Sequence, residues 1–434
     1  MILSPICLTR CAVRMHVILT LIRRRRPTPG PAVSLHPKPT ARRRLQCSYL
    51  VARPTARLGL SGAAIVGILL YGCGEPEDPG EATHVVVTQE ERWPSGYEWR
   101  VAPEPIVELG SASGAPDFEF YRIATALMLG DGRIAVGERS SQRIRVFDPD
   151  GRRLLLTLGG QGRGPGEFTG LSWFGLFSGD SIFAWDSDQF RGTVFGPDGQ
   201  YVRTVAIENT TGLPIIFPDL VFPDGSILVR AGPPKIQTDS TGESWGYEYF
   251  GVYGKDGKHI STIGMLPVDR CTNTSGLPCR TMVFGPRARW AAGDGRLYFG
   301  TSVDYLIRGL NLDGSTAFAF RRAFSARNVT DEDVRVLDSG GSSARAPEER
   351  AVAAIMPAFD RILTDLQGQV WVRNYRSHTW SVFSSSGKFR GSLAMPQGLH
   401  VHQIGHDYVL GVTRDSLDVE RVVVHRLFKP LEEG

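Results

Sequence analysis

Short apolar segments, separated by polar turns that carry glycine or aspartate, recur from residue 122 to the end of the chain. Three of them, at residues 134–136 (IAV), 297–299 (LYF) and 370–372 (VWV), are apolar at every position. Because successive side chains of a β-strand point to opposite faces, such strands need both faces covered. The pattern therefore predicts strands in sheets that are packed between two neighbouring sheets.

The turns between these segments are regularly spaced. Pairs of turns lie 19 residues apart at Gly132 and Gly151, Asp180 and Gly199, Gly295 and Gly314, and Gly368 and Gly387. A further copy keeps both turns with 13 additional residues between them, and the last copy ends after two strands. Repeats of about 40–50 residues built from short strands are typical of propeller blades. We predict an all-β chain forming a six-bladed β-propeller, with blades at residues 122–160, 171–207, 218–265, 284–325, 360–395 and 400–428.

A strand-like segment before the first blade, residues 104–109 (EPIVEL), offers a way to close the ring. The last blade lacks an outer strand, and an open sheet edge exposes unpaired backbone groups. We expect this N-terminal strand to pair with residues 422–424 (VVV) and to complete the sixth blade.

Two insertions interrupt the repeat. The first is rich in aromatic residues, which are Trp245, Tyr247, Tyr249, Phe250 and Tyr253. The second spans residues 330–359 and predicts a short helical insertion between blades 4 and 5. Thr330 is its expected N-cap, acidic residues follow in the first turn, and residues 346–359 continue with an Ala-rich, helical composition. Insertions between blades are where function usually lies.

Charge divides the chain unevenly. Residues 1–73 contain 12 Lys and Arg and no Asp or Glu, so the remainder has 37 basic and 45 acidic residues, a net charge of −8. The overall charge of +4 therefore comes from the N-terminus, and we expect no nucleic-acid partner.

The N-terminal region has the pattern of an export signal. Fifteen uncharged residues, 58–72, follow Arg53 and Arg57 and precede Cys73. The ending LYGC, residues 70–73, resembles the bacterial lipobox, which implies lipidation of Cys73 and stable membrane anchoring. An ordinary signal peptide with a coincidental cysteine is the alternative. We assign residues 1–50 to a doubtful disordered leader, 51–73 to a lipoprotein signal peptide, 74–97 to a flexible tether and 98–430 to the propeller.

The leader itself has two interpretations. Translation starting at Val51 would give a signal of normal length, whereas the arginines at residues 42–44 are compatible with a twin-arginine export signal. We expect a monomer that is lipid-anchored in the bacterial cell envelope, in the outer membrane or facing the periplasm.

Two remaining cysteines, Cys271 and Cys279, flank seven turn-forming residues and predict a local disulfide in an exported protein.

A family resemblance supports this architecture. The segment GGQGRGPGEF after a predicted outer strand, the repeated DGRI and DGRL turns, and MPAFDRILTDLQGQVWVRNY with YVLGVTRDSLDVERVVVHRL resemble the bacterial six-bladed, NHL-like β-propeller lipoproteins of unassigned function. The resemblance spans about residues 98–430 and implies the fold. It implies no chemistry, because propellers carry unrelated functions.

Candidate functional residues fall into three groups. His400, His402 and His406 are the candidate zinc ligands, since two of them share one face of the expected innermost strand of blade 6, and a zinc-dependent lyase among six-bladed propellers also uses channel histidines. A rim of mixed charge follows the second strands, and it lacks the concentrated acidic ligands of calcium-dependent lactonases. The rim residues are Arg139, Asp186, Arg230, Asp304, Arg373, Asn374, Arg414 and Asp415, and the aromatic candidates are Trp245, Tyr247 and Tyr249.

These features favour a non-catalytic protein- or glycan-binding module, in which tyrosine and tryptophan supply large contact areas. The alternative is a metal-dependent hydrolase or lyase, lactonase-like or amidating-lyase-like, that acts at the channel mouth. We expect no cofactor in the first case and zinc or calcium in the second.

Overall fold

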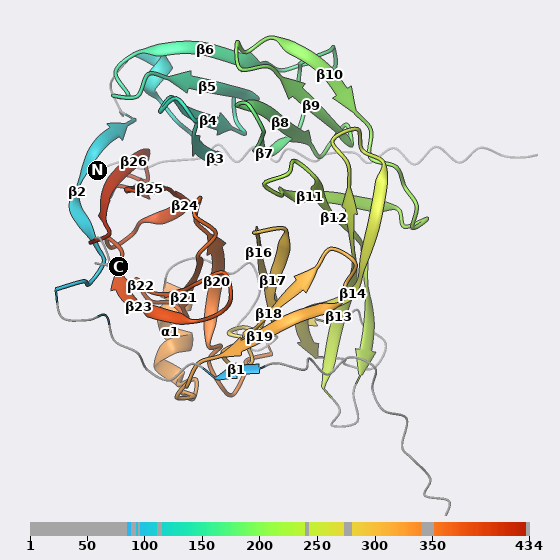
Figure 1. Cartoon of the computed structure of the whole chain (residues 1–434), viewed down its shortest axis with the longest axis vertical. Helices are drawn as coiled ribbons and strands as arrows, with labels where there is room; N and C mark the ends of the chain where they lie inside the picture. The colour runs from blue at the N-terminus through green and yellow to red at the C-terminus, as the bar shows by residue number, and fades with distance from the viewer. Residues whose placement is uncertain are drawn as a thin grey trace, which may run out of the picture. The chain divides into compact units, whose positions relative to one another are not determined.

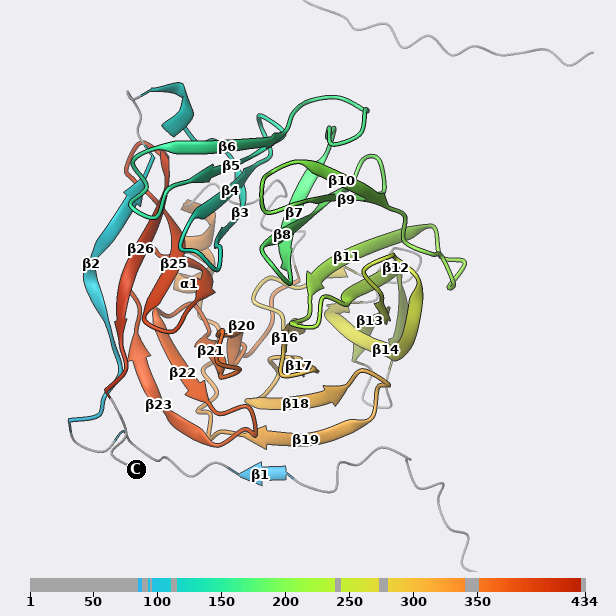
Figure 2. The ribbon, with the colours of Figure 1, turned by 45° about the horizontal axis from the view of Figure 1, so that its top comes forward.

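The computed structural model describes residues 85–87, 93, 96–110, 115–238, 243–272, 280–339 and 351–430. Within the compact unit Gly74–Gly434, these residues form six sheets that are arranged in a ring (Figure 1 and Figure 2). The chain is a six-bladed β-propeller, and the predicted fold class is confirmed. In the described part of the chain, no helix is long and apolar enough to cross a membrane.

The first three blades follow one another along the chain, from the innermost strand outward. Blade 3 differs, because its three central strands are long and a short fifth strand extends its outer edge. Blade 1 contains β3 (Ile123–Met128), β4 (Ile134–Glu138), β5 (Arg143–Phe147) and β6 (Leu154–Gly159). Blade 2 contains β7 (Leu171–Phe177), β8 (Ser181–Asp186), β9 (Arg191–Phe195) and β10 (Tyr201–Val205). Blade 3 contains β11 (Ile215–Val221), β12 (Ile227–Thr238), β13 (Ser244–Tyr253), β14 (His259–Thr272) and β15 (Arg280–Thr281).

The last three blades complete the ring. A short strand β1 (Val85–Val87) lies parallel to the outer strand of blade 4. Blade 4 contains β16 (Arg289–Gly293), β17 (Arg296–Gly300), β18 (Leu306–Asn311) and β19 (Thr316–Arg321). Blade 5 contains β20 (Phe359–Thr364), β21 (Val370–Asn374), β22 (Thr379–Phe383) and β23 (Phe389–Ala394). Blade 6 contains β24 (His400–Ile404), β25 (Tyr408–Arg414), β26 (Glu420–Phe428) and the N-terminal strand β2 (Arg100–Leu109).

The second strand of each blade is buried on both faces where its sequence is continuously apolar. Residues 134–136, 297–299 and 370–372 are each at most 2% exposed. Apolar clusters lie between neighbouring blades; one joins Val146 of blade 1 to Phe174 of blade 2, and another joins Tyr298 of blade 4 to Phe383 of blade 5. Each sheet is therefore stabilised by the sheets on its two sides, as the sequence pattern predicts.

Strand β2 closes the ring as predicted. It pairs antiparallel with β26, and Val107, Glu108 and Leu109 lie opposite Val424, Val423 and Val422. Leu109 is 1% exposed and packs at the junction of blades 6 and 1. The first and last parts of the propeller thus share one sheet, which removes the open edge of β26.

The helical insertion is confirmed in part. Helix α1 (Asp331–Ser339) lies between blades 4 and 5. The Thr330 hydroxyl accepts a hydrogen bond from Asp333 N–H at 3.3 Å, and the Asp333 carboxylate accepts one from Thr330 N–H at 2.9 Å. This reciprocal pair makes Thr330 the N-cap, as expected.

The expectation of helix in the Ala-rich segment is wrong for its described part, residues 351–358. These residues form extended bridges, including Val283 with Val352 and Asn328 with Ile355. Backbone hydrogen bonds from Val283 N–H to Ala351 and from Met356 N–H to Arg327 hold them, at 2.7 and 2.8 Å. Pairing with segments distant in sequence outweighs the helical propensity of alanine, because propensity contributes only a few tenths of a kcal/mol per residue.

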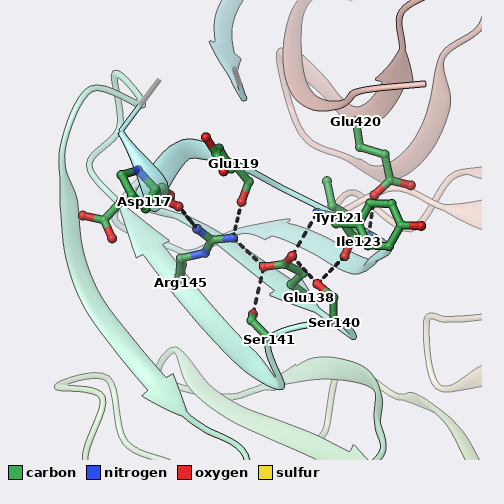
Figure 3. Close-up of polar contacts among 10 residues, drawn as sticks. Asp117, Glu119, Tyr121, Ile123, Glu138, Ser140, Ser141, Arg145 and Glu420 are labelled. Carbon is green, nitrogen blue, oxygen red and sulfur yellow. Dashed lines mark hydrogen bonds and ion pairs between the residues drawn. The ribbon is translucent and has the colours of Figure 1, made fainter. Parts of the chain in front are cut away.

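A buried ion pair binds residues 117–121, in the segment between the closing strand β2 and blade 1 (Figure 3). Arg145 and Glu138 lie 2.5 Å apart, and their side chains are 8% and 6% exposed. The Arg145 guanidinium also donates to the carbonyls of Asp117 and Glu119, at 2.8 and 2.7 Å. Glu138 accepts from Tyr121 N–H at 2.9 Å. Both charges are therefore bonded to this segment as well as to each other.

Strand β1 and Trp93 lie within residues 74–97, the range predicted as a tether, and both contact the propeller. Val85, Val86 and Val87 pair with Ala319, Phe320 and Arg321 of blade 4. Trp93 stacks on Trp99 with ring centroids 4.9 Å apart, and its indole N–H donates to the Ser392 carbonyl of blade 5 at 3.3 Å.

Candidate functional site

The two histidines of β24 lie on the innermost strand of blade 6, with ring centroids 5.1 Å apart. His402 Nδ1 accepts a hydrogen bond from Ala126 N–H at 3.0 Å. His400 Nε2 is 2.8 Å from Arg361 Nη1, and the guanidinium is the donor because it has no acceptor atom. Each ring thus uses one of its nitrogens as an acceptor within the protein.

The surroundings of both rings favour the neutral form. Part of the His400 ring is exposed, but the protein atoms around it desolvate it, and together with Arg361, Arg373 and Arg414 they lower its pKa to about 4. Burial, and then His400 and Arg361, lower the pKa of His402 well below its usual value. Both histidines are therefore uncharged at neutral pH.

The third candidate ligand lies elsewhere. His406, in the turn before β25, lines a cavity of about 640 Å³ with Glu98 and Lys429, and neither His400 nor His402 lines this cavity. Among the described residues, no group of three or more His, Cys, Asp or Glu side chains is arranged to hold a metal ion. A zinc or calcium site stays a prediction, and two neighbouring imidazoles are its only geometric support here.

The arginines of the predicted rim are held by other parts of the protein. Arg230 contacts Glu248 and lies 3.2 Å from Asp219, and its guanidinium stacks over Trp290 at 5.0 Å. The other three also have partners. Arg373 pairs with Asp360 at 2.5 Å, Arg414 with Glu420 at 2.6 Å, and Arg139 donates to the Ser172 carbonyl at 2.9 Å.

The acidic and amide residues of the rim differ in exposure. Asp186 is fully buried and accepts hydrogen bonds from the N–H groups of Thr169, Asp188 and Gln189, at 2.7–2.9 Å. Burial alone would raise its pKa, but these bonds lower it, so Asp186 is an ionised anchor for the loops around it. The others are at least partly accessible. Asp304 pairs with Arg321 at 3.0 Å, Asp415 with Arg421 at 3.4 Å, and Asn374 lines a cavity described below.

Two arginines that the sequence analysis did not select contribute to the channel wall. Arg289 of β16 donates only to the carbonyls of Asp360 and Ala288, at 2.5 and 2.8 Å. Arg361 of β20 donates only to His400. Neither has a carboxylate within ion-pair distance among the described residues, and burial followed by Arg373 lowers the pKa of Arg361 to about 10. Sequence position could have suggested them, because both lie near the start of innermost strands: Arg289 is the first residue of β16 and Arg361 the third of β20.

The aromatic candidates form one half-buried row, which we call the aromatic stripe: Trp245, Tyr247 and Tyr249. They alternate along β13 with the buried residues Ser244, Gly246, Glu248 and Phe250, so the three rings share one face. Their cross-strand neighbours are Gln237 and Arg270 for Trp245, Lys235 and Pro267 for Tyr247, and Met265 for Tyr249. The other two aromatic residues of the insertion, Phe250 and Tyr253, belong to the core.

The strand that carries the stripe and its two neighbours are longer than the strands of blades 1 and 2. β12, β13 and β14 contain 12, 10 and 14 residues, compared with five to seven in the strands of blades 1 and 2. Figure 1 shows them as the long strands at the lower right of the propeller. The extra length forms a projecting three-stranded ribbon.

A cavity of about 560 Å³ lies between blades 4 and 5 and is bounded by α1. We call it the helix-side cavity. Blade 4 and the residues after it contribute Tyr305, Arg322 and Phe324. Asn374 ends β21 of blade 5, Tyr375 and Arg376 follow it, and Glu332, Asp333 and Val336 belong to α1. Of the rim predicted from the sequence, only Asn374 lines it.

The predicted covalent sites are only partly described. Cys73 lies outside the described residues. Cys271 is 6% exposed on β14, and Cys279 also lies outside the described residues, so the pairing of these two cysteines stays a prediction.

Comparison with known proteins assigns this chain to no family. No family model matches the chain, and no curated protein matches its sequence. A protein of Bacteroides fragilis described as exported has 11% identity and a TM-score of 0.44, covering 80% of this chain and 99% of its own.

Two further solved structures are similarly distant. A DUF4221 family member from Bacteroides vulgatus has 9% identity and a TM-score of 0.47, with 77% and 99% of the two chains covered. Virginiamycin B lyase from Staphylococcus aureus has 11% identity and a TM-score of 0.37, with 76% and 99% covered. At these values the similarity transfers no activity to this chain, and function must be argued from its own residues.

Proposed function

We propose that this chain is a lipid-anchored β-propeller of the bacterial cell envelope that binds a protein partner through the aromatic stripe and catalyses no reaction. The observation that carries the proposal is the half-buried row of Trp245, Tyr247 and Tyr249 on the projecting ribbon of blade 3.

The composition around the stripe supports a protein partner. The cores of protein interfaces are enriched in Tyr, Trp, Met and Arg, and the stripe combines its three aromatic rings with Met265 and Arg270. Met265 is 44% exposed, whereas the opposite face of β13 is buried. A rigid sheet presents these side chains at little entropic cost, which favours binding.

The charged rim supports a scaffold more than a catalyst. Arg230, Arg373 and Arg414 are each bonded to a carboxylate, and the Asp186 carboxylate is used by backbone N–H groups. These groups hold loops in position and neutralise one another. The alternative of a metal-dependent hydrolase would need further ligands to join His400 and His402.

The aromatic stripe is tested by crosslinking in cells. A photoreactive residue in place of Tyr247, or of Met265, should give the same discrete adduct with one protein. The matched control replaces Tyr201 of blade 2, which is 41% exposed compared with 44% for Met265, and should give none.

With the purified partner, Trp245→Ala should weaken binding about 10-fold or more, because central aromatic residues carry most interface energy. If no protein adduct forms and the chain binds a polysaccharide in a way that depends on Trp245, the partner is a glycan and the proposal of a protein partner is wrong.

The lipid anchor is tested separately. Incorporation of a labelled fatty acid is expected in the natural chain and absent in Cys73→Ser, because acylation needs the Cys73 thiol, and the unlabelled variant should leave the membrane fraction. Cys47→Ser is the control and should keep the label. A mature amino terminus upstream of Cys73, determined by sequencing of the membrane-extracted protein, would contradict the proposal.

A further inference from the structure

The helix-side cavity contains positive charge that the protein does not neutralise. Its two acidic residues are already paired: Asp333 with Arg327 and Glu332 with Arg335, each at 2.9 Å. The guanidinium groups of Arg322 and Arg376, by contrast, have no carboxylate within 4.0 Å among the described residues, although the backbone N–H of Arg376 donates to the Asp360 carboxylate at 3.0 Å. The Arg376 guanidinium lies over the Phe284 ring at 5.3 Å.

Arg322 is held in one orientation by its neighbours. Its guanidinium lies 4.7 Å from the Phe389 ring centroid and 5.9 Å from that of Tyr305, and Nη1 donates to the Ser381 hydroxyl. Nε is buried without a hydrogen-bond partner, and no partner of Nη2 lies among the described residues. Two nitrogens of an oriented guanidinium, Nε and Nη2, therefore remain for an acceptor, and a fixed guanidinium matches the two oxygens of a carboxylate.

A second unpartnered donor lies beside it. Tyr305 is 3% exposed, and its hydroxyl has no hydrogen-bond partner among the described residues, while the neighbouring Arg322 and Ser381 are bonded to each other. Buried polar groups nearly always have a partner, so an orphaned hydroxyl at the wall of a cavity indicates a missing one. Burial raises the pKa of Tyr305 to about 12, although Ser381 and Arg322 act in the opposite direction. The phenol is consequently a hydrogen-bond donor at neutral pH.

The remaining wall suits a flat apolar group. Phe324 and Tyr375 line the cavity, and its volume of about 560 Å³ lies within the range of small-molecule sites. Burial raises the pKa of Tyr375; Arg376, Arg287 and Arg289 act in the opposite direction as nearby cations, and Asp360 acts with burial as a nearby anion.

We propose that the helix-side cavity binds a small organic oxyanion, a carboxylate attached to a planar apolar body, with Arg322 and Tyr305 as donors to the oxyanion and Phe324 and Tyr375 against the body. The site is separate from the aromatic stripe, so this inference stands if the protein partner proposed above is disproved.

The experiment measures binding of defined probes to the full-length chain in detergent, by isothermal titration and by thermal shift. Benzoate should bind at millimolar or lower concentration, and benzamide, which has the same ring without the charge, at least 10-fold more weakly. Phenyl phosphate distinguishes a phosphate preference from a carboxylate preference. Tighter binding of phenyl phosphate would overturn the carboxylate assignment.

Two variants test the donors. Arg322→Gln should weaken benzoate binding about 10- to 100-fold, the range expected for loss of a hydrogen bond to a charged group. Tyr305→Phe removes only the orphaned hydroxyl, should fold normally and should weaken binding about 10-fold. Arg308→Gln, an exposed arginine of β18, removes the same charge elsewhere and should leave the affinity unchanged. Failure of every probe to bind, equal binding of benzamide, or unchanged affinity in both variants would overturn the proposal.

Discussion

Deletion of residues 101–110 is expected to abolish cooperative folding of the propeller or to lower its melting temperature by roughly 10 °C. The deletion removes most of β2, including Leu109, which is 1% exposed in the closed ring, and it exposes the edge of β26. Burial of one leucine contributes about 1.5–3 kcal/mol, and the half-buried Val101 and Val107 add to it. A loss of roughly 5 kcal/mol is comparable with the whole stability of a typical domain.

A second deletion is the control. Removal of residues 74–90 eliminates β1, whose three residues pair with the outer edge of blade 4. We expect a cost of about 1–2 kcal/mol, because each hydrogen bond contributes about 0.5–1.5 kcal/mol net. Thermal unfolding followed by circular dichroism compares the two deletions. Equal melting temperatures would show that ring closure through β2 does not carry the stability of the propeller.

The buried pair Glu138–Arg145 should give the largest effect of a single substitution. Arg145→Met is expected to destabilise the protein by about 3–5 kcal/mol, because it leaves the Glu138 carboxylate buried without its charge partner. It also leaves the carbonyls of Asp117 and Glu119 without donors (Figure 3). Urea unfolding at neutral pH measures the change in the free energy of unfolding.

Arg139→Met is the matched control for this substitution. Arg139 lies beside Glu138 in the sequence, but it is exposed, and among the described residues its guanidinium donates only to the Ser172 carbonyl. Its loss should cost less than about 1 kcal/mol, as for other exposed polar contacts. Similar unfolding midpoints for the two variants would mean that burial of the Glu138–Arg145 pair has no energetic consequence.

The positions of the blades could be predicted from the sequence because two local signals agree. Continuous apolar strands report burial on both faces, and the turn glycines are spaced by the length of a hairpin. The partner of residues 104–109 followed from the same reasoning, since residues 422–424 formed the only predicted edge left unpaired. Helix α1 could also be predicted, because Thr330 and Asp333 carry their own capping signal.

Functional residues were harder to predict because their environment depends on contacts between blades. Asp186 and Asn374 end equivalent strands, yet Asp186 is buried as a loop anchor and Asn374 lines a cavity. Arg373 and Arg361 lie opposite each other across two strands, but only Arg373 is bonded to Asp360. No pattern of spacing distinguishes these pairs.

The sequence by itself determined that the chain forms six double-sided sheets, and it determined how the ring of sheets is closed. Only the tertiary structure decided that residues 351–358 are extended, and that Tyr305 and Arg322 of blade 4 line the same cavity as Tyr375 of blade 5. It also decided which arginine side chains have no carboxylate within ion-pair distance among the described residues. The reason is physical. Hydrophobic periodicity depends on residues that are close in the sequence, whereas charge pairing and cavities depend on side chains that packing brings together from distant parts of the chain.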